Sequence, residues 1–181
     1  MTAAGLTPGD PRPTLAGRLV RLRPGRTEDA PRLHGILGEP SVSRWWGEPG
    51  PVTVIEEDLR GSGSAVMLVV EIDGEVAGGI QYDEEEDPMY RHANIDIFLG
   101  AAYQGRGVGP ETVALLARFL CERRGHHRIT IDPAAANARA IRCYEKVGFR
   151  PVGVMRQYER SADGEFHDGL LMELLRDDLL D

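Results

Sequence analysis

Apolar and polar residues alternate along several short stretches of this chain, a pattern that predicts β-strands. In residues 92–99, for example, Ile95 and Ile97 alternate with Asn94 and Asp96. An Asp-Gly pair at 73–74 separates two β-rich stretches, and this dipeptide is typical of a two-residue hairpin turn. From alternation, β-rich composition or a short buried stretch, seven strands are predicted, over residues 19–23, 65–72, 75–82, 92–99, 128–131, 152–157 and 170–175.

Other stretches repeat their apolar residues at the spacing of a helix. Residues 107–124 give the clearest case, with Leu116 and Leu120 on one face and Pro110 in the first turn, where its missing N–H costs nothing. The other predicted helices cover residues 41–46, 54–59 and 137–147, and a further one follows Thr27. This order of elements predicts an α+β fold, with helices flanking one mixed, mostly antiparallel sheet of about seven strands.

The distribution of Pro and Gly indicates how the chain is organised. Residues 1–14 are rich in both and poor in apolar side chains, so we expect a flexible tail there. The rest of the chain shows no linker and no internal repeat. Residues 15–181 are therefore predicted to form a single domain.

Composition and charge exclude several classes of partner. The net charge of −8 argues against a nucleic-acid ligand, which needs basic patches, and weakly favours a cationic substrate. No apolar run approaches the ~20 residues of a membrane helix, and no secretory signal is visible, so a cytoplasmic protein without a membrane partner is expected.

The Cys and His residues do not indicate a metal site. Cys121 and Cys143 fall inside predicted helices and lack the spacing of metal ligands, so we expect reduced thiols and no metal. His126 and His127 fall at the end of a predicted helix, where surface or capping roles are expected.

A glycine-rich turn between a predicted strand and the longest predicted helix indicates an anion site. It reads Gln104-Gly105-Arg106-Gly107-Val108-Gly109. Glycines allow the backbone to approach a bulky anion, and the N–H groups at the start of the helix point toward it. A dinucleotide fingerprint would need a βαβ unit and a parallel sheet, whereas these glycines follow an antiparallel meander.

A second motif follows at Asn137-x-x-Ala140-x-x-x-Tyr144-Glu145-Lys146-x-Gly148-Phe149. Together with Gln104-x-x-Gly107-x-Gly109, it resembles the GNAT family of acetyl-CoA-dependent N-acetyltransferases, over about residues 17–175. The resemblance implies the GNAT fold, in which two neighbouring strands splay apart to form the acetyl-CoA cleft. Acetyl-CoA is thus the expected co-substrate.

The resemblance also implies which residues hold acetyl-CoA. The strand near residues 97–99 would pair with the pantetheine arm, the glycine turn would hold the pyrophosphate, and Asn137 would hydrogen-bond the arm. The implied cofactor-binding residues are Ile97, Phe98, Leu99, Gln104, Gly105, Arg106, Gly107, Val108, Gly109, Asn137, Arg139 and Tyr144.

Two catalytic residues are expected. By the resemblance, Tyr144 would protonate the departing thiolate, for which a neutral phenol is suited; the alternative is a ring that only packs under the sheet. An alkylamine is mostly protonated at pH 7, so a base is required, and Asp96 is the candidate because it points away from Ile95 and Ile97. A solvated strand-face carboxylate is the alternative. Backbone N–H near a bulge of this strand would stabilise the oxyanion.

Within the GNAT family, several segments resemble aminoglycoside 6′-N-acetyltransferases, a family linked to antibiotic resistance. They are Trp45-Trp46-Gly47, residues 84–88, Ile95-Asp96 and Asp132-Pro133. The resemblance implies that Trp46, Glu84, Asp96, Asp132 and Asp163 bind a polycationic drug, for which carboxylates and an indole face are suitable partners. The alternatives are a packing Trp46, a solvated glutamate loop and an Asp132 that caps the next helix.

Residues 164–172 instead look like GNAT enzymes that modify proteins or small metabolites. We therefore expect N-acetylation of a cationic small molecule, with an aminoglycoside as the first candidate. An endogenous metabolite of the siderophore type, or a protein N-terminal or lysine amine, is the second. A non-catalytic acyl-CoA sensor is the third, and a monomer or homodimer is expected.

Overall fold

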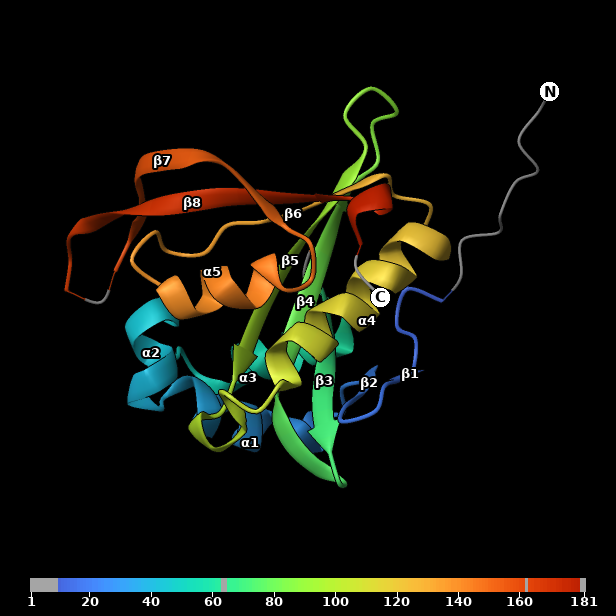
Figure 1. Ribbon diagram of the computed structural model, residues 1–181. Helices are drawn as coiled ribbons and strands as arrows, with labels where there is room; N and C mark the ends of the chain where they lie inside the picture. The colour runs from blue at the N-terminus through green and yellow to red at the C-terminus, as the bar shows by residue number, and fades with distance from the viewer. Residues whose placement is uncertain (1–9, 63–64, 162, 180–181) are drawn as a thin grey trace.

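The computed structural model describes residues 10–62, 65–161 and 163–179 (Figure 1). Its centre is one eight-stranded sheet in the order β1-β2-β3-β4-β5-β6-β8-β7, in which only β5 and β6 pair in parallel. The expected α+β fold, with a mixed and mostly antiparallel sheet, is confirmed. The strands are β1 (Leu15–Ala16), β2 (Arg21–Pro24), β3 (Val66–Ile72), β4 (Glu75–Glu85), β5 (His92–Leu99), β6 (Arg128–Ile131), β7 (Arg150–Arg160) and β8 (Phe166–Leu175).

Among the described residues, five α-helices accompany the sheet, and each lies where a helix was predicted. They are α1 (Ala30–Leu37), α2 (Pro40–Trp46), α3 (Val52–Arg60), α4 (Val108–Glu122) and α5 (Ala138–Glu145). Three short 3-10 segments complete the set: η1 (Thr27–Asp29), η2 (Ala101–Tyr103) and η3 (Arg176–Asp178).

The alternation in β3 explains why the sheet has helices on both faces. Leu68 and Val70 point into one apolar cluster, which includes the buried face of α4. Met67 and Val69 point into the other, which α1 and α3 cover. Since every second residue of a strand faces the same side, one strand supplies both cores. In Figure 1, α4 crosses one face of the sheet, and α1 and α3 lie on the other.

The sheet opens between β5 and β6. These strands pair only at Ala93 with Ile129 and at Asn94 with Thr130. Within the described residues, the remaining part of β5, residues 95–99, pairs with β4 alone. The expected splayed strands are therefore present, and one edge of β5 is left with backbone N–H and C=O groups that no strand satisfies.

Some expectations about local structure were wrong. The predicted bulge in residues 92–99 does not exist, because β4 and β5 pair in continuous register from Gly78–Leu99 to Glu85–His92. The sheet has one strand more than predicted, the two-residue β1, which was too short to show alternation. β4 extends to Glu85 and therefore includes the first part of the predicted acidic loop.

The predicted tail falls partly on residues 1–9, outside the described residues. In the part that follows, Tyr82 donates a hydrogen bond to the Pro11 carbonyl, and Arg12 donates one to the Leu59 carbonyl at 2.9 Å.

No helix among the described residues is long and apolar enough to cross a membrane.

Candidate active site

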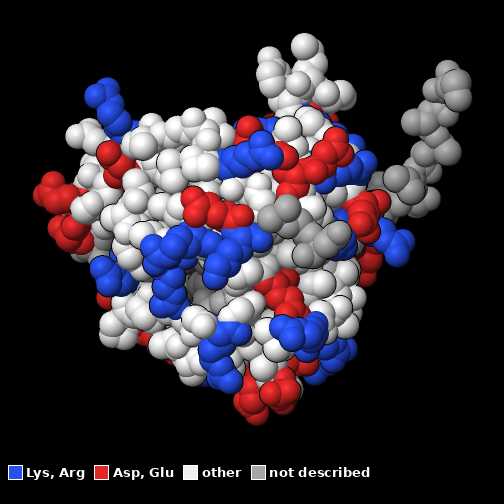
Figure 2. Space-filling model, in the orientation of Figure 1, with Lys and Arg blue, Asp and Glu red and all other residues white. Residues whose placement is uncertain are grey.

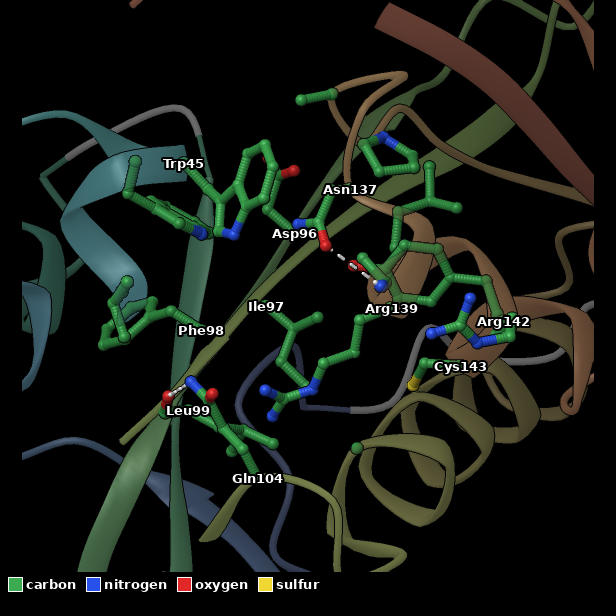
Figure 3. A pocket seen from close by; sticks show the side chains of 18 of the residues that line it. Trp45, Asp96, Ile97, Phe98, Leu99, Gln104, Asn137, Arg139, Arg142 and Cys143 are labelled. Atoms are coloured by element: carbon green, nitrogen blue, oxygen red, sulfur yellow. Dashed lines mark hydrogen bonds between the residues drawn. The ribbon is translucent and has the colours of Figure 1, made fainter. Parts of the chain in front are cut away.

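A cleft of about 630 Å³ lies where β5 and β6 diverge. Its walls come from α2, the open edge of β5, the glycine turn before α4, the loop after β6, α5 and β7. In Figure 3, Trp45 reaches toward it from α2, and Arg142 lies on the opposite side on α5. The cleft is therefore lined by α2 and by several segments between residues 94 and 159.

The glycine turn is shaped as the sequence predicted. Gly105 and Gly107 have φ angles of 75° and 82°, in the left-handed region that favours glycine, and Gly107 is the N-cap of α4. A Cβ at Gly105 would meet no atom within 4 Å, so the space above this turn is open. The first N–H groups of a helix bind anions, and here they adjoin the cleft.

The side chain of Gln104 stabilises this turn. Its Nε2 donates a hydrogen bond of 2.6 Å to the carbonyl of Leu99, the last residue of β5 (Figure 3). The bond ties the turn to the end of the open strand. Gln104 also lines the cleft, so the same side chain both forms part of the cleft wall and stabilises the turn.

Two of the predicted cofactor-binding side chains lie elsewhere. Val108 is buried in the core, and Arg106 donates a hydrogen bond of 3.3 Å back to the Ala102 carbonyl. Neither side chain lines the cleft. From this turn, Gln104, Gly105, Gly107 and Gly109 line the cleft instead.

Basic side chains of α5 surround the same end of the cleft. Arg139, which the sequence predicted, extends toward Gln104 in Figure 3, and Arg142 and Lys146 line the cleft beside it. The last two were missed, although their spacing of three and seven residues from Arg139 puts them on one helical face. Basic groups gather over α5 in Figure 2 even though the chain carries a net charge of −8.

Asn137 starts α5 and faces the cleft. Its Oδ1 accepts a hydrogen bond of 3.1 Å from the Ala140 N–H, which makes it the N-cap of the helix. The side-chain NH₂ group is a donor, and Asn137 is a cleft residue together with Ile97, Phe98 and Leu99 of the β5 edge.

Close packing of α4 on α5 brings Tyr144 to the cleft. A Cβ at Gly109 would come within 3.0 Å of the Cys143 Sγ, so glycine allows α5 to approach. Tyr144 lines the cleft although the residue is only 6% exposed, and burial raises its pKa. It therefore carries its phenolic proton at neutral pH. Burial also raises the pKa of Cys143 to about 11, which keeps this thiol neutral, as expected.

Asp96 lines the cleft from the centre of the β5 edge. Burial, together with the negative charge of Asp132, raises its pKa to about 6, although a hydrogen bond of 3.5 Å from Gln81 acts in the opposite direction. A carboxylate with such a pKa is ionised at pH 7 and is still basic enough to accept a proton.

The sequence-predicted Asp132 lines the cleft from the loop after β6 and has two neighbours that were not predicted. Tyr158 and Glu159 of β7 line the same end of the cleft. A hydrogen bond with Asp132 raises the pKa of Tyr158 to about 12. Burial, together with the charge of Asp132, raises the pKa of Glu159. This end of the cleft is therefore acidic.

Trp46 closes the cleft from α2. Its indole packs edge-on against Phe98, with ring centroids 5.1 Å apart, and 38% of the residue remains exposed. Both the packing role and the binding role considered for this residue are compatible with that position. Trp45 also lines the cleft, with the guanidinium of Arg44 4.6 Å from its ring centroid.

Glu84 is separate from the cleft. On β4 it follows the buried residues Ile80 and Tyr82 on one face of the strand, and its carboxylate binds Arg124 (2.7 Å) and His126 (2.6 Å). Burial disfavours its charged form, but the two hydrogen bonds outweigh burial and lower its pKa to about 2. The expectation of a surface or capping role for His126 was wrong, because this residue is fully buried.

Asp163 is also separate from the cleft. It is exposed in the turn between β7 and β8, where it accepts hydrogen bonds from the Glu165 N–H and from His167. In the part of the chain that the structure describes, no group of three or more His, Cys, Asp and Glu side chains could hold a metal ion.

Comparison with known proteins assigns the family. A family model described as "Acetyltransferase (GNAT) domain" matches residues 26–156. The chain belongs to the GNAT acetyltransferases. The resemblance drawn from the two sequence motifs is thereby confirmed, and so is the splayed sheet that it implied.

Two relatives are similar over most of their length. Aminoglycoside N(6′)-acetyltransferase type 1 of Klebsiella pneumoniae is 32% identical over 155 residues, which cover 75% of this chain and 76% of the relative. Spermidine N(1)-acetyltransferase of Escherichia coli K12 is 28% identical over 158 residues, which cover 84% of each.

Two solved structures are also similar. The aminoglycoside acetyltransferase AAC(6′)-Ib, in complex with parmomycin and acetyl-CoA, has a TM-score of 0.72 at 26% identity and covers 88% of this chain. Mycobacterium smegmatis RimJ, in complex with CoA-disulfide, has a TM-score of 0.80 at 23% identity and covers 94%. The match covers 95% of the first chain and 89% of the second.

The residues present in this GNAT protein fit acetyl-CoA. The open edge of β5 offers unpaired amide groups to a pantetheine arm, and the open turn at Gly105, with Arg139 and Arg142 beside it, suits phosphates. Together with the named relatives, this makes the chain an acetyl-CoA-dependent N-acetyltransferase.

The position of Glu84 leads to a prediction about stability. Glu84→Gln should lower the free energy of unfolding by about 3 kcal/mol, because it removes the charge that binds the half-buried Arg124 and the buried His126. The KM for the amine should not change, since Glu84 does not line the cleft. Denaturant unfolding and steady-state kinetics measure the two effects.

The matched control is Glu75→Gln at the exposed start of the same strand, which should change stability by less than ~0.5 kcal/mol. A raised amine KM in Glu84→Gln, with unchanged stability, would instead assign Glu84 to substrate binding.

Proposed function

We propose that this enzyme transfers the acetyl group of acetyl-CoA to a primary amine of a polycationic small molecule, with an aminoglycoside as the first candidate. The observation that carries the proposal is the polarity of the cleft. Arg139 and Arg142 line it from α5, and Asp132 and Glu159 line its acidic end, where their charges also act on Asp96 at the centre of the β5 edge. The basic end suits phosphates, and the acidic end suits ammonium groups.

Both named relatives support an acceptor with several amino groups. The relative that is 32% identical is named for aminoglycosides, and the one that is 28% identical is named for spermidine. Trp45 and Trp46 add flat apolar surfaces to the acidic end, where an indole face can attract a cation. A polyamine is therefore the second candidate, favoured by the longer match of the spermidine enzyme.

The proposed chemistry is direct transfer. Bound acetyl-CoA supplies an activated acetyl thioester. Asp96 accepts the proton that the ammonium group must lose before the amine can attack, and its raised pKa suits this step. Tyr144, a neutral phenol in the wall of the cleft, donates a proton to the departing thiolate. The free N–H groups of the β5 edge are available to stabilise the developing oxyanion.

The proposal is tested by following thiol release from acetyl-CoA with a panel of aminoglycosides, spermidine and peptide amines. We expect turnover with acceptors that carry several positive charges and little with a monoamine of similar size. Turnover with peptides alone would contradict the proposal, and acetyl-CoA binding without turnover on any amine would favour a sensor.

Asp96→Asn should lower kcat/KM for the amine by roughly 10²-fold or more if Asp96 is the base, and part of the loss should return at high pH. In the wild type, kcat/KM should fall as the pH drops through about 6, because protonation removes the base. That acidic limb should disappear in the variant. A pH profile that keeps its limb near 6 in Asp96→Asn would exclude this assignment.

The same substitution should also make the protein more stable. The pKa of Asp96 is higher in the folded state than in the unfolded chain, so its ionisation above pH ~4 costs folding free energy. Removing the charge should recover on the order of 1–3 kcal/mol at pH 7. Asp73→Asn, in the exposed β3–β4 turn at φ 51°, is the control, because Asn tolerates this conformation.

Tyr144→Phe should lower kcat by ~10²-fold or more while leaving acetyl-CoA affinity nearly unchanged, because only the proton donor is lost. The ring contact with Phe149, at 6.1 Å between centroids, should survive. Single-turnover kinetics and acetyl-CoA binding measure the two quantities. Tyr90→Phe, an exposed tyrosine outside the cleft, should behave as wild type, and an active Tyr144→Phe would reduce Tyr144 to a packing residue.

A further inference from the structure

β7 departs from regular pairing at the point where it reaches the cleft. It is an edge strand that pairs with β8, and its register shifts between Met155 and Glu159. Met155 lies opposite Gly169 and Glu159 opposite His167, so four residue steps on β7 span two on β8. β7 therefore contains a bulge, and such bulges often redirect side chains beside an active site.

One side chain of β8 binds the centre of this bulge. Gln157, in its centre, has a φ of 50°, a conformation that a non-glycine residue adopts only when its surroundings hold it. The backbone N–H of Gln157 donates a hydrogen bond of 2.8 Å to the Asp168 Oδ1. The carboxylate thus replaces the backbone partner that the register shift removes.

The bulge brings the next two residues to the acidic end of the cleft. Both Tyr158 and Glu159 line it with Asp132. The ring of Tyr158 lies on Gly169, where a Cβ would come within 2.8 Å of the Tyr158 Cδ1. The absence of a side chain at Gly169 therefore allows the position of the Tyr158 ring.

The backbone around Asp168 also holds the loop that carries Asp132. The Ala135 N–H donates to the Asp168 carbonyl at 2.7 Å, and the Leu170 N–H donates to the Pro133 carbonyl at 2.8 Å. These bonds do not involve the Asp168 side chain. Removing the carboxylate should therefore release Tyr158 and Glu159 and leave the Asp132 loop in place.

We propose that Asp168 is a positioning residue for the acceptor end of the cleft, because its carboxylate fixes the β7 bulge that directs Tyr158 and Glu159 toward the amine. This assignment rests on the proposed function, in which the acidic end of the cleft binds the acceptor. Glu159 is the group that pairs with a second ammonium of the acceptor. Asp168 itself touches neither substrate.

The test compares three variants of the full chain in steady-state kinetics. Asp168→Ala should raise the KM for a polycationic acceptor by roughly 10-fold and leave the KM for acetyl-CoA unchanged, because the glycine turn and α5 are not affected. Asp168→Asn should retain most of the wild-type KM, since its Oδ1 can still accept the Gln157 N–H. Glu165→Ala, an exposed carboxylate on the same hairpin, is the matched control and should have no effect.

A substitution at a different residue tests the role of the bulge while Asp168 is kept. Gly169→Ala should displace the Tyr158 ring and raise the acceptor KM in the same way. Amide hydrogen exchange should show the Gln157 N–H protected in wild type and in Asp168→Asn, and exposed in Asp168→Ala. An unchanged acceptor KM in Asp168→Ala, or an equal rise in both KM values, would overturn the assignment.

The kinetics use whichever amine the wild-type enzyme acetylates. Turnover of uncharged or peptide amines only would refute the proposed acceptor class, and the selective effect of Asp168→Ala on the acceptor KM would still be measured with that amine. The proposed acceptor class is therefore refuted by the substrate panel, whereas the positioning role of Asp168 is refuted by the KM values of its variants.

Discussion

The parting of β5 from β6 is the constraint on which the rest of this structure depends. Two residue pairs, at Ala93 and Asn94, hold the strands together, and beyond them β5 has a free edge. A free edge inside a fold must find other hydrogen-bonding partners, because unsatisfied buried amides are costly. The other walls of the cleft come from the glycine turn, α5, β7, α2 and the loop after β6. The fold thus leaves a site for an extended, amide-containing ligand as part of its own topology.

The charges of the cleft follow from which element supplies each wall. α5 presents Arg139, Arg142 and Lys146 on one helical face, next to the positive N-terminal end of α4. The strands β5 and β7 and the loop after β6 present Asp96, Glu159 and Asp132. Because these carboxylates are partly buried and close to one another, the pKa values of Asp96 and Glu159 rise. The same crowding that makes Asp96 suitable as a base reduces the stability of the folded chain, a cost often found at active sites.

The parts of the molecule that the sequence predicted are those with a local cause. Local sequence patterns predicted seven of the eight strands, and the glycine turn has the left-handed φ angles that its composition required. Contacts distant in sequence account for what was missed. Glu84 was assigned to a loop because its partners, Arg124 and His126, lie 40 and 42 residues further along the chain. Only these contacts show why an acidic residue occupies a half-buried position at this end of β4. Tyr158 and Glu159 were missed because nothing local indicates a bulge whose stabilising carboxylate belongs to the opposite strand.

This difference also explains why the sequence predicted the coenzyme half of the site better than the acceptor half. The coenzyme half is built from one continuous region, residues 95–109, and one helix, and its motifs identify the GNAT family. The proposed acceptor half combines α2, the loop after β6 and a bulged edge strand, and hydrogen bonds from residues 168–170 join the last two of these segments. Small changes in those bonds move side chains such as Tyr158 without affecting the sheet. An acceptor site built in this way can change its substrate while the fold and the coenzyme site are retained.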